Sequence, residues 1–281
     1  MIKILTDSAS DLPEKIIKRY KIDVLPFVIN LNGREYRDGI DINSKDIFQA
    51  IREGKEVFTS QVPQNILYQR LETYASQGFD CLYIGFSSKL SGTYQTARMI
   101  AKEVDEKFPE VNVATVDSLA GSLAQGMIVE RAAIMKENGA SLHNIIQKIQ
   151  QQTKKVEHIF SIDDLKHLYR GGRIRLSSAW LGSVLKIKPV LHVTDGKIEP
   201  LEKQRGNKRL LRRIVDIVDE RGDNLSHQTI GIAHADDENK ALQLRNMLME
   251  RLNCKQFVIN QIGCVLSAHL GVGGVGVFFN A

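Results

Sequence analysis

CLYIGFSSKLSGTYQ, residues 81–95, joins a short apolar run to a turn rich in serine and glycine and then to a long helical stretch. The run Cys81–Phe86 has the length and composition of a buried strand, and the residues after Gly92 follow a helical period. A strand that ends in such a turn and leads into a helix is half of a βαβ unit. This segment therefore predicts an α/β fold with a parallel sheet.

The rest of the first half repeats this alternation. Further strands are expected at 2–6, 22–27 and 111–116, and helices at 12–20, 66–76, 93–108 and 120–138. The pattern then changes, because the strands expected at 188–193 and 197–201 flank a hairpin turn, Thr194-Asp195-Gly196. We expect two domains. Residues 1–156 form a three-layer α/β domain with a parallel sheet, and residues 157–281 form a smaller two-layer α/β domain whose mixed sheet has helices on one face.

Two hydroxyl-rich segments, Thr59-Ser60-Gln61 and residues 87–95, are expected where strands end. Ligands of parallel sheets bind beyond the carboxyl ends of the strands. A helix that starts there also directs unpaired N–H groups and its positive dipole end toward one point, which favours an anion. Hydroxyl groups add donors without charge, so a single carboxylate is a better match than a polyphosphate. The competing interpretation is that Ser88 or Ser91 only caps the helix.

Composition describes an ordinary globular chain. The 281 residues are 43% hydrophobic and 25% charged, and they contain neither a membrane-length apolar run nor an N-terminal secretion signal. Three cysteines, Cys81, Cys254 and Cys264, lack metal-ligand spacing and are expected to be reduced core residues of a cytoplasmic protein. Between Asp163 and Arg213 the chain has 13 basic and 5 acidic residues. That excess predicts a docking face for an anionic partner or, equally, a solvated surface.

The familiar nucleotide and metal motifs are absent or lack their context. Gly271–Gly276 has the spacing of a dinucleotide fingerprint, but an apolar strand follows it where a helix would be required. No phosphate-binding loop of the Walker type is present. His234 lies beside Asp236 and Asp237, which are better explained as caps of the following helix than as metal ligands.

No set of residues in the sequence has the pattern of a catalytic site. Asp163-Asp164 is best explained as a helix start, and no nucleophile-elbow pattern occurs. His269, in a glycine-rich setting, is either a structural residue or a donor to an anion that protonation would strengthen. We therefore expect a binding protein that is not an enzyme, with no cofactor and no metal.

These segments together resemble the DegV family of bacterial fatty-acid-binding proteins. The matching elements occur in family order over the whole chain: residues 5–12, 59–61, 90–95, 116–118, 171–174 and 267–269. The resemblance implies two α/β domains with a long-chain fatty acid between them as the bound ligand, its acyl chain in an apolar tunnel. It implies that Thr59 and Ser91 bind the carboxylate, with Gly92 contributing backbone and His269 nearby.

The resemblance also implies a partner. A fatty acid kinase catalytic subunit would phosphorylate the bound carboxylate to an acyl phosphate for phospholipid synthesis, and Arg173 and Arg205 would belong to the surface that docks it. Transient contact with a membrane surface stays open. Two other functions remain as alternatives. One is a phosphoryl-transfer enzyme related to dihydroxyacetone kinases, although no nucleotide motif is present. The other is a nucleic-acid-binding protein, for which the basic region offers few aromatic residues.

Overall fold

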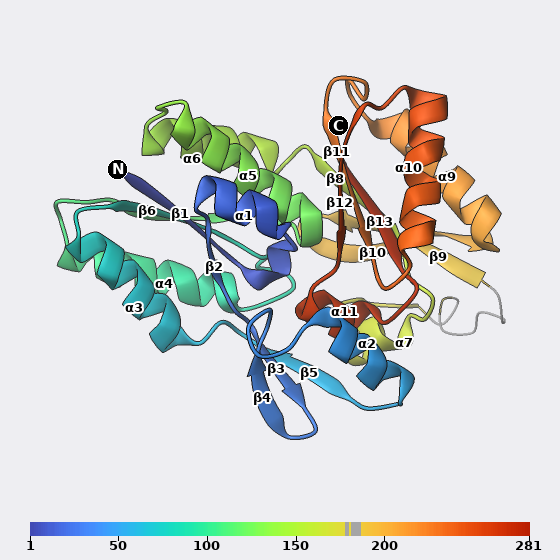
Figure 1. Ribbon diagram of the computed structural model, residues 1–281, viewed down its shortest axis with the longest axis horizontal. Helices are drawn as coiled ribbons and strands as arrows, with labels where there is room; N and C mark the ends of the chain where they lie inside the picture. The colour runs from blue at the N-terminus through green and yellow to red at the C-terminus, as the bar shows by residue number, and fades with distance from the viewer. Residues whose placement is uncertain (178–179, 181–186) are drawn as a thin grey trace.

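Four parallel strands form the first sheet of the computed structural model, in the order β2-β1-β6-β7 (Figure 1). The structure describes residues 1–177, 180 and 187–281. The bounds of these strands are Ile2–Asp7 (β1), Asp23–Leu25 (β2), Asp80–Gly85 (β6) and Val113–Asp117 (β7). β1 is paired on both sides, and β6, which contains the apolar run of residues 81–85, is fully buried beyond its first residue. The predicted parallel sheet is confirmed.

Helices cover both faces of this sheet and complete three layers. α3 and α4 lie on one face, whereas α1, α5 and α6 lie on the other, above the sheet in Figure 1. Their bounds are Glu14–Tyr20 (α1), Gln64–Ser76 (α3), Thr93–Lys107 (α4), Ser122–Glu137 (α5) and Leu142–Gln152 (α6). A short 3-10 helix, η1 (Ser8–Ser10), follows β1.

The part of the chain that connects α1 to α3 forms a small antiparallel sheet that was not predicted. Its order is β4-β3-β5, with the bounds Val28–Leu31 (β3), Arg34–Arg37 (β4) and Val57–Ser60 (β5), and α2 (Ser44–Arg52) precedes β5. Thr59 pairs with Ile29 inside this sheet. The expectation that Thr59-Ser60-Gln61 follows a strand of the parallel sheet is therefore wrong, because β5 belongs to the antiparallel one.

The second half forms a mixed six-stranded sheet in the order β10-β9-β8-β13-β11-β12. Its strands are Val156–Ser161 (β8), Ile187–Thr194 (β9), Lys197–Arg205 (β10), Thr229–His234 (β11), Gln256–Gln261 (β12) and Val275–Asn280 (β13). Among the described residues, the helices of this half are Lys166–Arg170 (α7), Asn207–Arg221 (α9), Glu238–Leu252 (α10) and Cys264–Leu270 (α11). β9 and β10 form the expected hairpin around residues 194–196.

The two faces of this second sheet have different coverings. α9 and α10 pack on one face around a core that includes Ile214, Leu244 and Phe279. α5 contacts β8, β11 and β13 on the other face, so the larger core runs continuously from the parallel sheet to Ala233 and Phe278. The expectation of helices on a single face is thus incomplete, because α5 serves both sheets. This shared helix brings the two halves together along a long seam.

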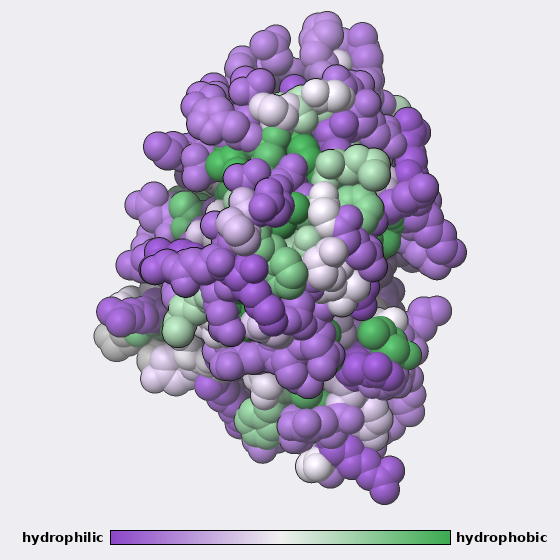
Figure 2. All heavy atoms as spheres, turned by 90° about the vertical axis from the view of Figure 1, so that its left-hand side faces the viewer, coloured by the Kyte–Doolittle hydropathy of each residue, from purple (hydrophilic) through white to green (hydrophobic). Residues whose placement is uncertain are grey.

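The surface over the parallel-sheet half is mostly hydrophilic, with small scattered apolar patches (Figure 2). Cys81, Cys254 and Cys264 are free and buried, as predicted. In the described part of the chain, no helix is both long enough and apolar enough to cross a membrane.

Candidate functional site

A cavity of about 650 Å³ lies where β5, the loop between β6 and α4, and α11 meet. Thr59, Ser91, Gly92 and His269 all line it, although residue 59 and residue 269 are at opposite ends of the chain. The antiparallel sheet supplies Thr59, the start of α4 supplies Ser91 and Gly92, and α11 supplies His269. Tertiary packing therefore gathers the four predicted ligand-binding residues around one space.

Thr59 and His269 are directly linked. A hydrogen bond of 2.9 Å joins Thr59 Oγ1 and His269 Nε2. Burial is the main cause that lowers the pKa of His269 to about 4, and Arg173 and the neighbouring His167 act in the same direction. The imidazole is thus neutral near pH 7, so His269 presents a neutral donor or acceptor rather than an imidazolium.

Ser91 and Gly92 lie at the N-terminus of α4. The Thr93 N–H donates to Ser91 Oγ at 3.2 Å, so this hydroxyl satisfies a backbone group of the first turn while it lines the cavity. The two interpretations of Ser91, a capping residue and a cavity residue, are therefore compatible.

Gly92 has a steric reason to lack a side chain. A Cβ at this position would come within 2.5 Å of Gln61 Nε2. The Gln61 amide is oriented by Thr96, whose hydroxyl donates to Gln61 Oε1 at 3.1 Å. Gln61 also lines the cavity and adds an amide donor beside Ser91, a role that the sequence alone did not assign to it.

The start of α11 is held by buried carboxyl groups. Asp11 Oδ1 accepts from the Gly263 N–H at 2.8 Å, and Asp38 Oδ1 accepts from the Cys264 N–H at 3.2 Å. Burial raises the pKa of Asp11 to about 8, although its hydrogen bonds with Ser122 and Gly263 oppose that shift. These contacts place the helix that carries His269 against the first half of the chain.

The two predicted docking arginines lie in different places. Arg173 lines the cavity, and its Nε donates to the Leu90 carbonyl at 3.1 Å. Arg205 is exposed at the end of β10 opposite to Ile198, which also lines the cavity. At the usual rise per residue, that strand separates the two positions by on the order of 20 Å. The structure therefore brings Arg173, but not Arg205, to the predicted carboxylate-binding residues.

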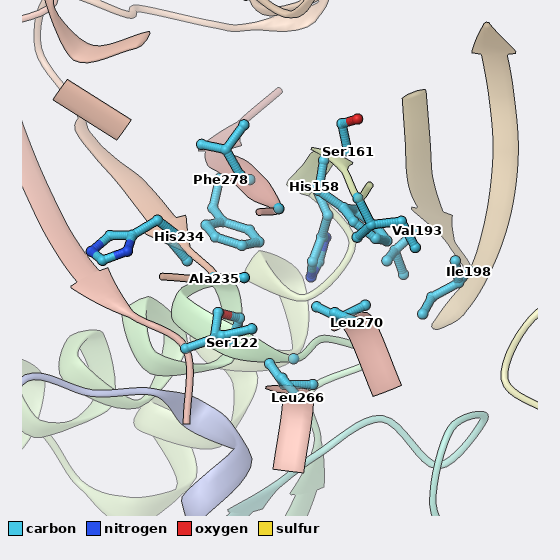
Figure 3. Close-up of a pocket in the computed structure, with 18 of the residues that line it drawn as sticks. Ser122, His158, Ser161, Val193, Ile198, His234, Ala235, Leu266, Leu270 and Phe278 are labelled. Atoms are coloured by element: carbon cyan, nitrogen blue, oxygen red, sulfur yellow. The ribbon is translucent and has the colours of Figure 1, made fainter. Parts of the chain in front are cut away.

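A narrow apolar slot lies beside the cavity, in the seam between α5 and the second sheet (Figure 3). About 70 Å³ of it is open, and its exposed lining is almost entirely apolar. Five residues line both spaces: Phe86, Leu90, Ile198, Leu266 and Leu270. The cavity and the apolar slot thus adjoin each other across a shared wall, a feature that no single stretch of sequence encodes.

Several other hydroxyl groups near the strand ends have structural roles. Ser87 Oγ donates to the Gly196 carbonyl at 2.7 Å and fastens the tip of the β9–β10 hairpin to the first half. Ser118 Oγ donates to the Gly85 carbonyl at 2.7 Å, between neighbouring strands. These side chains therefore hold the halves and strands together, and Ser91 is the hydroxyl of its segment that lines the cavity.

The rejected motifs have the predicted structural roles in part, because Asp236 pairs with Arg52 and Asp163 with Lys188 instead of capping a helix. Asp237 accepts from the Lys240 N–H and caps α10. Asp164 Oδ1 accepts from the Lys166 N–H at the start of α7. Gly271–Gly276 joins a helix to the following strand β13, the reverse of a dinucleotide-binding order. Among the residues that the structure describes, no cluster of histidine, cysteine and acidic side chains is arranged to hold a metal ion.

The chain is similar to members of the DegV family in both sequence and architecture. A family model described as "Uncharacterised protein, DegV family" matches residues 1–281. A DegV domain-containing protein of Clostridium perfringens is 39% identical over 279 residues, which cover 98% of this chain and 96% of that protein. Protein DegV of Bacillus subtilis is 31% identical over 278 residues, 98% of each chain.

Solved structures agree. A DegV family protein from Thermus thermophilus, described as fatty acid binding, has a TM-score of 0.92 at 31% identity and covers 100% of this chain and 99% of its own. Bacillus subtilis DegV, described as a fatty acid binding protein, has a TM-score of 0.87 at 30% identity and covers 100% of this chain and 99% of its own. On its full-length match, its identity to these relatives and its shared architecture, this chain is a member of the DegV family.

Proposed function

We propose that this protein binds a long-chain fatty acid, with the carboxylate in the cavity and the acyl chain in the apolar slot. The observation that carries the proposal is that a cavity with polar groups and an apolar slot lie side by side and share five lining residues. The solved relatives from Thermus thermophilus and Bacillus subtilis, both described as fatty acid binding, support the same ligand class.

In this proposal, the acyl chain supplies most of the affinity. Each buried methylene contributes about 0.8 kcal/mol, so a sixteen-carbon chain contributes on the order of 10 kcal/mol before its ordering cost. Thr59, Ser91, the Gly92 backbone and His269 then orient the carboxylate through neutral hydrogen bonds. Hydrogen bonds to a charged group contribute about 1.5–3 kcal/mol each, which is enough to define the position of the head group.

We further propose that the protein performs no chemistry and presents the carboxylate to a partner fatty acid kinase for phosphorylation to an acyl phosphate. Residues 1–156 carry the carboxylate-binding loops, and residues 157–281 cover the acyl chain. Arg173 lines the cavity, and in this proposal it contacts both the head group and a docked kinase, whereas Arg205 lies farther out on β10. The exposed position of Arg205 suits contact with a partner rather than with the ligand.

Removal of the two hydroxyl groups tests the head-group assignment. The double variant Thr59→Ala/Ser91→Ala is expected to bind stearate about 100-fold more weakly, because two hydrogen bonds to a carboxylate are lost. The gain in affinity for each added methylene is expected to stay as in the unaltered protein, since the slot is untouched. Binding is measured by displacement of a fluorescent fatty acid, with a series of chain lengths as competitors.

The matched control is Thr73→Ala/Ser76→Ala, which removes the same two hydroxyl types from exposed positions on α3, where they bond to their own helix. It is expected to bind as the unaltered protein does. Unchanged affinity, together with unchanged phosphorylation by a fatty acid kinase, in the Thr59/Ser91 variant would reject the assignment. Mass spectrometry of an organic extract of the purified protein tests the ligand class independently.

A further inference from the structure

One polar side chain lies inside the apolar slot. His158, on β8, projects its ring among the lining side chains, between Phe278 and Leu270 (Figure 3). Only 4% of the residue is exposed. Its ring meets that of Phe278 edge-on, with 5.7 Å between the centroids. An imidazole at this depth is unusual in a slot whose exposed lining is almost entirely apolar.

The ring nitrogens of His158 are not satisfied by the protein. Neither Nδ1 nor Nε2 makes a hydrogen bond of normal geometry with a described residue. Burial lowers the pKa of His158 to about 4, and the nearby Val156 carbonyl offsets only part of that effect. The ring is therefore neutral near pH 7, with one N–H donor and one acceptor. Leaving such groups buried without partners is costly, so a ligand that pairs with them gains affinity.

Two other lining residues also have a buried polar atom without a partner, Ser161 Oγ and His234 Nδ1. Figure 3 shows that the Ser161 hydroxyl points away from the centre of the slot and that the His234 ring is turned away from the other labelled side chains. His158 is thus the one of these three residues whose ring lies among the apolar side chains of the slot.

We propose that His158 recognises a hydroxyl group on the acyl chain, so that this protein selects hydroxylated fatty acids over the corresponding plain ones. This inference rests on the proposed fatty acid function and specifies its ligand class. A hydroxyl both donates and accepts, so it is complementary to a neutral imidazole in either tautomer. A plain chain leaves both ring nitrogens unpaired and gains only from the burial of its methylenes.

The open part of the slot is compatible with this role. At about 10–15 Å³ for each water-sized group, 70 Å³ holds roughly five such groups, fewer than the methylenes of a long chain. The lining side chains must therefore move apart when an acyl chain enters. That same movement exposes the His158 ring to the chain, at one depth along it. Selection should consequently depend on where the hydroxyl lies.

The experiment compares stearate with positional isomers of hydroxystearate, whose hydroxyl lies at successive positions from the carboxylate end to the methyl end. The full chain is freed of lipid, and each Kd is measured by displacement of a fluorescent fatty acid. The preference ratio is the Kd of stearate divided by the Kd of the hydroxystearate. For one position of the hydroxyl, or two adjacent positions, we expect this ratio to be about tenfold larger in the unaltered protein than in His158→Phe. His158→Phe is also expected to bind stearate more tightly, because an unpaired polar group is removed.

Further variants separate hydrogen bonding from shape. Val193→Ala, at another lining position, is expected to weaken the binding of stearate and of hydroxystearate by the same factor, so that the ratio of their Kd values stays unchanged. His158→Gln is expected to keep part of the ratio because its amide can donate and accept, whereas His158→Met is expected to lose it. His158→Met also replaces His158→Phe if the larger ring prevents folding.

Each outcome bears on one claim. This inference is overturned if the unaltered protein has the same preference ratio for every position of the hydroxyl along the chain. It is also overturned if a positional preference persists in both His158→Phe and His158→Met. In either case, binding of stearate itself leaves the proposed function intact. Failure of stearate and every hydroxystearate to bind overturns the proposed function and this inference with it.

Discussion

The contact between Gly92 and Gln61 allows a sharp test of the site. An alanine Cβ at position 92 would lie 2.5 Å from Gln61 Nε2, whereas ordinary contacts are about 3.5 Å or longer. The Gln61 amide must therefore move by about 1 Å. Since this amide is the far end of a flexible side chain, the movement costs little folding free energy. Gly92 has φ −74° and ψ −5°, which alanine adopts readily, so its unfolding free energy should change by no more than about 1 kcal/mol.

The functional effect of Gly92→Ala should be larger than its effect on stability. Displacement of Gln61 breaks the 3.1 Å hydrogen bond from Thr96, with a net contribution of about 1 kcal/mol, and moves an amide donor away from the cavity. We expect the affinity for stearate to fall about five- to tenfold. The assay is displacement of a fluorescent fatty acid, with thermal unfolding followed on the same samples.

A double-mutant cycle isolates the cause. In a Gln61→Ala background the new methyl group has no amide to displace, so Gly92→Ala should then change the affinity by less than about twofold. An equal loss in both backgrounds would refute the proposed contact, because the methyl group would then act on the ligand directly. Unaltered affinity in Gly92→Ala itself would show that neither Gln61 nor Gly92 shapes the head-group site.

Three further predictions concern charge and close packing. Because the pKa of His269 is about 4, the imidazole stays neutral, and affinity for stearate should vary less than threefold between pH 6 and 8; a tenfold change would contradict this. The pKa of Asp11 is raised by burial from 3.8 to about 8, so the folded chain holds this proton more tightly and stability falls as pH rises from about 4 to 8. In urea unfolding, Asp11→Asn should lose less stability between pH 5 and pH 8 than the unaltered protein does. Equal losses in the two proteins would contradict a raised pKa of Asp11. Gly171→Ala, whose Cβ would lie 2.6 Å from His269 Nδ1, should weaken stearate binding, whereas Gly172→Ala, at φ +70° in open space, should lower stability by about 1 kcal/mol and leave binding intact.

Local patterns predicted most of the regular structure. The strand expected at 81–86 and the helix expected at 93–108 correspond to β6 and α4, because a buried strand and a long helix each have a strong periodicity. The antiparallel sheet of β3, β4 and β5 escaped prediction. Its strands are four residues long, too short for a clear period, and their pairing is decided by contacts across the sheet rather than along the chain.

The candidate site, too, was predicted from the sequence only in part. Thr59, Ser91, Gly92 and His269 were identified from short motifs, and the structure places them around one cavity. The position of Arg173 in that cavity and the separate position of Arg205 follow from how the second half folds back on the first. The slot beside the cavity is lined by residues from both halves, in short runs that lie far apart in the sequence.

Sequence alone determined the class of the fold, the order of its main elements and the hydroxyl groups at the strand ends, because these depend on the properties of neighbouring residues. Tertiary structure decided that Thr59 meets His269, that α5 packs on both sheets and that His158 lies unpaired within the apolar slot. Such features arise from packing between distant segments. A cavity is the space that those segments leave, and its shape is set only when all of them are in place.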